Sequence, residues 1–135
     1  MSDCSDWNVV RMALIVIAED EFLIQDVLAM MLEDAGYEVE AASHGAAALD
    51  LVRQNKPALV VTDFMMPLMT GLELARAIRA DPALKAIPII LTSGAQGSIG
   101  RAEPKMFNAV LDKPYREDEL LATIAKLLGS AIASA

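Results

Sequence analysis

Five polar side chains come at or just after the ends of short apolar runs in this chain: Glu19, Asp20, Asp63, Ser93 and Lys113. If these runs are neighbouring strands, three carboxylates meet in one partly dry pocket, where they repel one another unless a cation neutralises them. With no histidine or cysteine beside them, the oxygen ligands favour magnesium, manganese or calcium over zinc. The pattern therefore predicts a site for a hard divalent cation.

The same residues supply the groups that phosphoryl transfer requires, namely a carboxylate nucleophile, a cation, a hydroxyl and an ammonium group. Pro67 and Gly71 favour a turn that brings the chain back over Asp63, where the backbone carbonyl of Met65 could face the same cation. Pro114 should hold Lys113 in an extended conformation, with its ammonium group directed at an anion.

The elements that must position these residues follow from hydrophobic periodicity. Short apolar runs alternate with segments of helical period, which predicts strand-helix units and a parallel sheet. We expect strands over residues 12–18, 37–42, 58–62, 89–92 and 109–111. We expect helices over residues 21–35, 45–54, 72–80 and 117–128.

Local signals support these boundaries. Gly36 should end the first helix, and Ser43 or His44 should cap the second. The segment 93–108 contains three glycines and a proline, so any helix within it should be short. The side of the first helix that should face the core carries Ile24, Val27, Leu28, Met31 and Leu32.

Right-handed crossovers turn such an alternating chain into a doubly wound α/β sheet with helices on both faces, whose ligand site lies beyond the carboxyl ends of the strands. We expect one domain over residues 12–128, with tails at 1–11 and 129–135. The chain of 135 residues is long enough to bury a core without disulfides or a structural metal.

Charge and composition limit the possible partners. The formal net charge of −8 opposes binding to nucleic acid, so proteins or cations are the expected partners. The apolar run 12–18 stops at an acidic cluster, which predicts neither a signal peptide nor a membrane span. The single cysteine, Cys4, cannot form an internal disulfide and favours the cytoplasm.

In order along the chain, the acidic pair Glu19-Asp20, Asp63 with Pro67 and Gly71, Ser93, and Lys113-Pro114 resemble the response-regulator receiver domain of two-component signalling. The resemblance covers roughly residues 12–128 and implies a flavodoxin-like fold with strand order 2-1-3-4-5. It also implies that Asp63 accepts a phosphoryl group from a kinase histidine. Glu19 and Asp20 would hold Mg²⁺ or Mn²⁺, and Ser93 and Lys113 would contact the phosphoryl oxygens.

Two positions depart from the family pattern. Family members usually carry an aromatic residue three positions before the lysine, whose ring moves inward on phosphorylation, whereas this chain has Val110. The segment between Ser93 and Lys113, which usually forms part of the output face, is interrupted by glycines and a proline. Output through this segment would require another mechanism, such as an order-disorder change.

The leading hypothesis is a stand-alone receiver, a phosphoacceptor rather than a conventional enzyme, and a monomer or weak dimer. A histidine kinase or phosphotransfer protein would dock near Phe22, around Met66 and around Pro114-Tyr115. Met66 and Leu68 could together form an exposed apolar patch. Output would be a protein contact or onward phosphotransfer.

Two other classes remain as alternatives. A pseudo-receiver would keep the fold and bind proteins without phosphorylation, and Val110 favours this reading. A small phosphatase with an aspartate nucleophile would need a second aspartate two residues after Asp63, where this chain has Met65.

Overall fold

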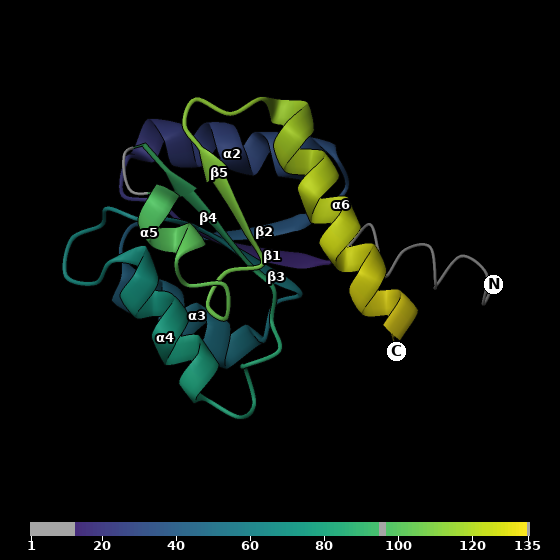
Figure 1. The fold of residues 1–135 in the computed structure, drawn as a ribbon. Helices are drawn as coiled ribbons and strands as arrows, with labels where there is room; N and C mark the ends of the chain where they lie inside the picture. Colours follow the sequence, from purple (N-terminus) through teal and green to yellow (C-terminus); the bar gives the residue numbers. More distant parts are fainter. Residues whose placement is uncertain (1–12, 95–96, 135) are drawn as a thin grey trace.

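The computed structural model describes residues 13–94 and 97–134, and side chains only as far as 129 within the last helix. Five parallel strands form one sheet in the order β2-β1-β3-β4-β5. Figure 1 shows this sheet in the middle of the molecule, between the helices. The strands are β1 (Leu14–Ala18), β2 (Glu38–Ala42), β3 (Leu59–Asp63), β4 (Ile89–Ser93) and β5 (Ala109–Asp112). The predicted doubly wound, flavodoxin-like sheet is confirmed.

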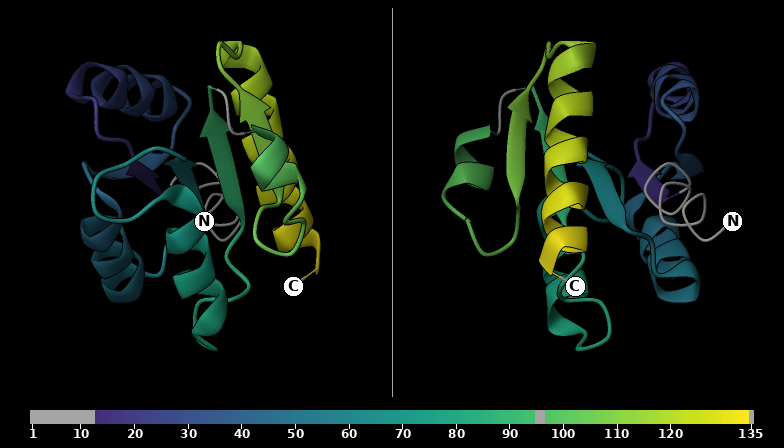
Figure 2. Two further views of the ribbon diagram at one scale, coloured as in Figure 1. Left: turned by 60° about the vertical axis from the view of Figure 1, so that its left-hand side comes forward. Right: turned by 90° about the vertical axis from the view of Figure 1, so that its right-hand side faces the viewer.

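Helices cover both faces of this sheet. On one face lie α2 (Phe22–Asp34) and α6 (Glu117–Ser134), and on the other lie α3 (Gly45–Asn55), α4 (Gly71–Ala80) and the short α5 (Gly97–Arg101), as Figures 1 and 2 show. Among the described residues, no helix is both long and apolar enough to cross a membrane.

Alternating side chains of the central strands build two separate cores. In β3, Val60 packs toward α3 and α4, while its neighbour Val61 packs toward α2 and α6. In β4, Leu91 and Ile90 divide in the same way. Strands that are buried on both faces read as continuous apolar runs, which explains why the sequence identified them.

Helix ends agree with most of the local signals. His44, and not Ser43, caps α3, because its Nδ1 accepts a hydrogen bond from the backbone N–H of Ala47 at 3.2 Å. Gly36 follows the end of α2 with a φ of 100°, a conformation that favours glycine. A capping box between Thr70 and Glu73 at the start of α4 was not anticipated.

Two sequence predictions about helices are wrong. The last helix does not end at Leu128 but continues to Ser134, because Gly129 lowers helix propensity by only about 1 kcal/mol and no proline follows it. Val27 does not face the core, and its side chain is 59% exposed. The predicted tail 1–11 lies outside the described residues, and the predicted domain limits stay a prediction.

The short α5 confirms the expectation for the glycine-rich segment. A Cβ placed on Gly100 would contact Leu91, so the helix lies directly on the sheet. Arg101 at its end pairs with Asp112 of β5, with 2.6 Å between nitrogen and oxygen. Val110 is half-buried and packs against the core on this face.

Two glycine substitutions should have opposite effects on stability. A Cβ on Gly71 would collide with the backbone carbonyl oxygen of Asp63, which cannot move without shifting the strand end. Gly71→Ala should therefore lower the free energy of unfolding by about 1–3 kcal/mol. A Cβ added to Gly129 in α6 would meet no other atom within 4 Å. Gly129→Ala should therefore raise the free energy of unfolding by about 0.5–1 kcal/mol, because alanine favours a helix more than glycine does.

Urea denaturation of the two variants beside the unmodified protein measures both changes. If both substitutions change the free energy of unfolding by the same amount, the lack of room for a side chain at Gly71 has no effect on stability.

Candidate functional site

The carboxyl ends of β1 and β3 bring three acidic residues together. One oxygen each from Glu19, Asp20 and Asp63 lies within 4.8 Å of the others. Glu19 is 2% exposed, and the other two are half-buried. Their donor atoms are all carboxylate oxygens, so the set fits a hard divalent cation such as Mg²⁺ or Mn²⁺.

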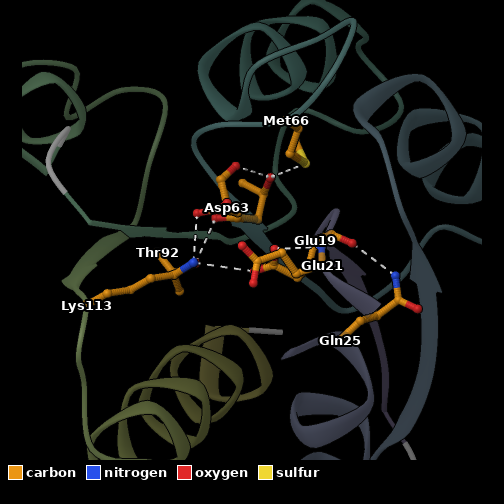
Figure 3. A network of polar contacts seen from close by, with 8 residues as sticks. Glu19, Glu21, Gln25, Asp63, Met66, Thr92 and Lys113 are labelled. Atoms are coloured by element: carbon orange, nitrogen blue, oxygen red, sulfur yellow. Dashed lines mark hydrogen bonds and ion pairs between the residues drawn. The ribbon is translucent and has the colours of Figure 1, made fainter. Parts of the chain in front are cut away.

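Lys113, just after β5, directs its ammonium group at two of these carboxylates, those of Glu19 and Asp63 (Figure 3). Its Nζ lies 3.1 Å from Asp63 Oδ1 and 3.4 Å from Glu19 Oε1. Burial alone would lower the pKa of Lys113, but the hydrogen bond and charge of Asp63, together with Glu19, raise the pKa above its ordinary value. The lysine therefore stays charged and neutralises part of the acidic cluster.

The carboxylate of Glu19 is the least exposed of the cluster. Burial raises its pKa, and the negative charge of Asp63 adds to this effect. The backbone N–H of Glu21, which donates to Glu19 Oε2 at 3.2 Å, and the charge of Lys113 act in the opposite direction. Its charged form thus depends on nearby positive groups, as expected of a carboxylate that takes part in binding a cation.

Ser93 ends β4 and is fully buried. Its carbonyl oxygen accepts a hydrogen bond from the backbone N–H of Lys113 at 2.7 Å, which joins the ends of β4 and β5. The residue before it, Thr92, lies opposite Asp63 in the strand register. The structure thus places Ser93 at the strand-end edge that carries Asp63 and Lys113.

Met66 is not the exposed contact that the sequence suggested. Its side chain is only 8% exposed and packs into the core, with its sulfur 4.0 Å from the hydroxyl oxygen of Thr62. The turn between β3 and α4 directs Met66 inward, whereas Leu68 is exposed as predicted and Met65 is exposed as well. An exposed patch that includes Met66 is therefore ruled out.

The other predicted partner contacts lie near the acidic cluster or at the surface. Phe22, at the start of α2, is 70% exposed. Pro114 is exposed and Tyr115 half-buried, and burial raises the pKa of Tyr115. Their role in partner binding stays a prediction, as does the binding of a cation by the Met65 carbonyl.

Leu68 is a further exposed apolar residue on the turn that follows Asp63. It is 88% exposed and adopts a φ of 72°, which is unfavourable for a branched apolar side chain. Leu68 therefore combines high exposure with a backbone conformation that residues other than glycine rarely adopt.

Sequence reasoning missed Gln25, which lies on the first turn of α2. Its side-chain Nε2 donates to the backbone carbonyl oxygen of Glu19 at 3.0 Å (Figure 3). A polar residue on a largely apolar helix was the only signal in the sequence, and it does not indicate which backbone group the side chain contacts.

Removal of the ammonium group should destabilise the protein in the absence of a divalent cation. Lys113→Met would leave Glu19 and Asp63 close together without their cationic partner, so we expect the free energy of unfolding to fall by about 2 kcal/mol. Mg²⁺ should then stabilise the variant more than it stabilises the unmodified protein. Lys126→Met, which removes an exposed lysine of α6, is the matched control.

Urea denaturation in EDTA and in Mg²⁺ tests this expectation. The electrostatic account fails if Lys113→Met and Lys126→Met behave alike in both solutions.

Comparison with known proteins agrees with the resemblance to receiver domains that the sequence motifs indicated, and it covers most of the chain. Residues 15–125 match the family described as response regulator receiver domain. The polar-differentiation response regulator DivK of Brucella anthropi is 30% identical over 119 residues, which are 87% of this chain and 97% of DivK. The response regulator Rre1 of Synechocystis is 29% identical over 89% of this chain and 53% of its own length.

Solved structures share the fold. The signal receiver domain of a histidine kinase from Syntrophus aciditrophicus has a TM-score of 0.81 at 28% identity and covers 87% of this chain and 91% of its own. The receiver domain of a Pseudomonas aeruginosa sensor histidine kinase, with a magnesium ion in its active-site cleft, has a TM-score of 0.80 at 25% identity. The match covers 87% of this chain and 98% of that domain. The chain belongs to the response-regulator receiver domain family of two-component signalling.

Proposed function

We propose that this receiver domain accepts a phosphoryl group onto Asp63, in a reaction that depends on a divalent cation, from a histidine kinase or a histidine phosphotransfer protein. The observation that supports the proposal best is the position of Asp63, whose carboxylate contacts Lys113 and lies within one cluster with Glu19 and Asp20. A nucleophile, a cation site and a fixed ammonium group are the parts that phosphoryl transfer needs.

In the proposed step, a carboxylate oxygen of Asp63 forms a bond to phosphorus while the bond from phosphorus to the histidine nitrogen breaks. The imidazole leaves and takes up a proton, and the product is an acyl phosphate on Asp63. Mg²⁺ or Mn²⁺, held by Glu19, Asp20, Asp63 and the Met65 carbonyl, would neutralise charge on the phosphoryl oxygens.

Lys113 has a second role in this proposal. Its ammonium group, which contacts Asp63 in the unmodified protein, would donate to a phosphoryl oxygen once that carboxylate has become an acyl phosphate. The hydroxyl of Ser93 would donate to another phosphoryl oxygen. Since Lys113 N–H already bonds to the Ser93 carbonyl, movement at one strand end would affect the other.

Exposed apolar side chains support docking of the donor protein on α2 and on the loops beside the acidic cluster. On α2, Leu23, Val27 and Met30 are exposed as well as Phe22. A groove between α2 and the start of α6 is lined by Leu23, Ile24, Val27, Leu28, Met31, Tyr115 and Glu117. Apolar surface of this kind on a domain of net charge −8 is typical of a protein-binding face.

For the output we propose a protein contact or onward phosphotransfer, with the domain acting as a stand-alone unit in the cytoplasm, as a monomer or weak dimer. The match covers 97% of DivK, so one response regulator similar to this chain consists almost entirely of this domain.

A pseudo-receiver that binds proteins without phosphorylation is the second candidate. Val110 favours it. In the family this position usually carries an aromatic residue whose ring moves inward on phosphorylation, whereas here it is a half-buried valine packed beneath α5.

Mass spectrometry after incubation with acetyl phosphate and Mg²⁺ separates the two candidates. We expect the mass of one phosphoryl group to be added to the unmodified protein and to Asp50→Asn, an exposed carboxylate control on α3. Asp63→Asn and treatment with EDTA should both prevent the addition. No addition to the unmodified protein, or addition that persists in Asp63→Asn, would contradict the proposal.

A further inference from the structure

The turn between β1 and α2 carries two of the three carboxylates, and several hydrogen bonds fix it. The N–H of Glu19 donates to the carbonyl oxygen of Ala42 at the end of β2, at 3.0 Å. The N–H of Glu21 donates to the Glu19 side chain at 3.2 Å. The third bond comes from the half-buried side chain of Gln25, whose Nε2 lies 3.0 Å from the Glu19 carbonyl oxygen.

The Gln25 bond acts on the peptide unit that joins Glu19 to Asp20. Because a peptide unit is planar, holding the Glu19 carbonyl oxygen also fixes the orientation of the N–H and Cα of Asp20. The direction in which the Asp20 side chain leaves the backbone follows from this orientation. Figure 3 shows the Gln25 amide pointing from α2 toward this turn.

We propose that Gln25 is a positioning residue for the cation site, which orients the Glu19–Asp20 peptide so that both carboxylates face Asp63. This inference rests on the proposed cation site and goes beyond it, because the Gln25 side chain donates to the backbone carbonyl of Glu19 and is not one of the three carboxylates. It acts through a backbone group of the residues that would hold the cation. Groups that orient metal ligands in this way typically change metal affinity about 10–100-fold when they are lost.

The chemistry of the side chain fits this role. A neutral amide donates a hydrogen bond without adding charge. Lysine or arginine could also donate but would bring a second cation close to a site that already contains Lys113. An ionised glutamate could not donate at all. Glutamine is therefore a suitable residue to hold the carbonyl without competing with the metal.

Calorimetric titration with Mg²⁺ tests the proposal without any phosphoryl donor. Gln25→Met keeps the length of the side chain and a high helix propensity but removes the donor. We expect its affinity for Mg²⁺ to fall about tenfold, with the same number of sites. The matched control is Asn55→Leu, which removes an exposed amide that donates to Glu40 at 2.6 Å and should leave Mg²⁺ affinity unchanged.

A second variant guards against poor folding of Gln25→Met. Gln25→Asn keeps the amide but is shorter by one methylene group, so it should also lose Mg²⁺ affinity. Circular dichroism without metal should show both variants folded. Mg²⁺ affinity equal to that of the unmodified protein in either folded variant would overturn the inference and leave the proposed function intact. If the unmodified protein itself binds no Mg²⁺, both this inference and the proposed function fail.

Discussion

Repulsion among the carboxylates at the ends of β1 and β3 is the constraint on which the site depends. Three acidic oxygens within 4.8 Å of one another are stable only if positive charge lies close to them. In the structure Lys113 supplies that charge, and its raised pKa shows that the acidic groups in turn keep it protonated. The remaining negative charge is what makes the pocket suitable for a divalent cation.

This balance requires that residues far apart in sequence meet within a few ångströms, and the parallel sheet meets that requirement. All five strands end at the same edge, so Glu19, Asp63, Ser93 and Lys113 arrive there from four different strands. Close packing then fixes the strand ends. Gly71 lies against the Asp63 carbonyl with no room for a side chain, and the Lys113 N–H bonds to Ser93.

The face of the sheet that α3, α4 and α5 cover differs from the usual receiver pattern at two places. Val110 stands where an aromatic residue is usual, and α5 has only five residues, held near β5 by the pair of Arg101 and Asp112. Both side chains of that ion pair are more than half exposed, so water screens the pair and it adds little to stability. The acidic site and the segment around α5 therefore differ in how they are held: the first lies at the ends of buried strands, whereas the second is held by close backbone packing and one surface ion pair.

The sequence by itself determined the order of strands and helices and the residues that meet at the strand ends, because runs buried on both faces and their polar ends are visible along the chain. Only the tertiary structure decided that Met66 turns inward, that Val27 faces solvent, and that Gln25 holds the Glu19 carbonyl. Each of these depends on which neighbouring element covers a given face or lies within hydrogen-bond distance. Periodicity cannot report such contacts, since it records the repeat of a segment and not the surface packed against it.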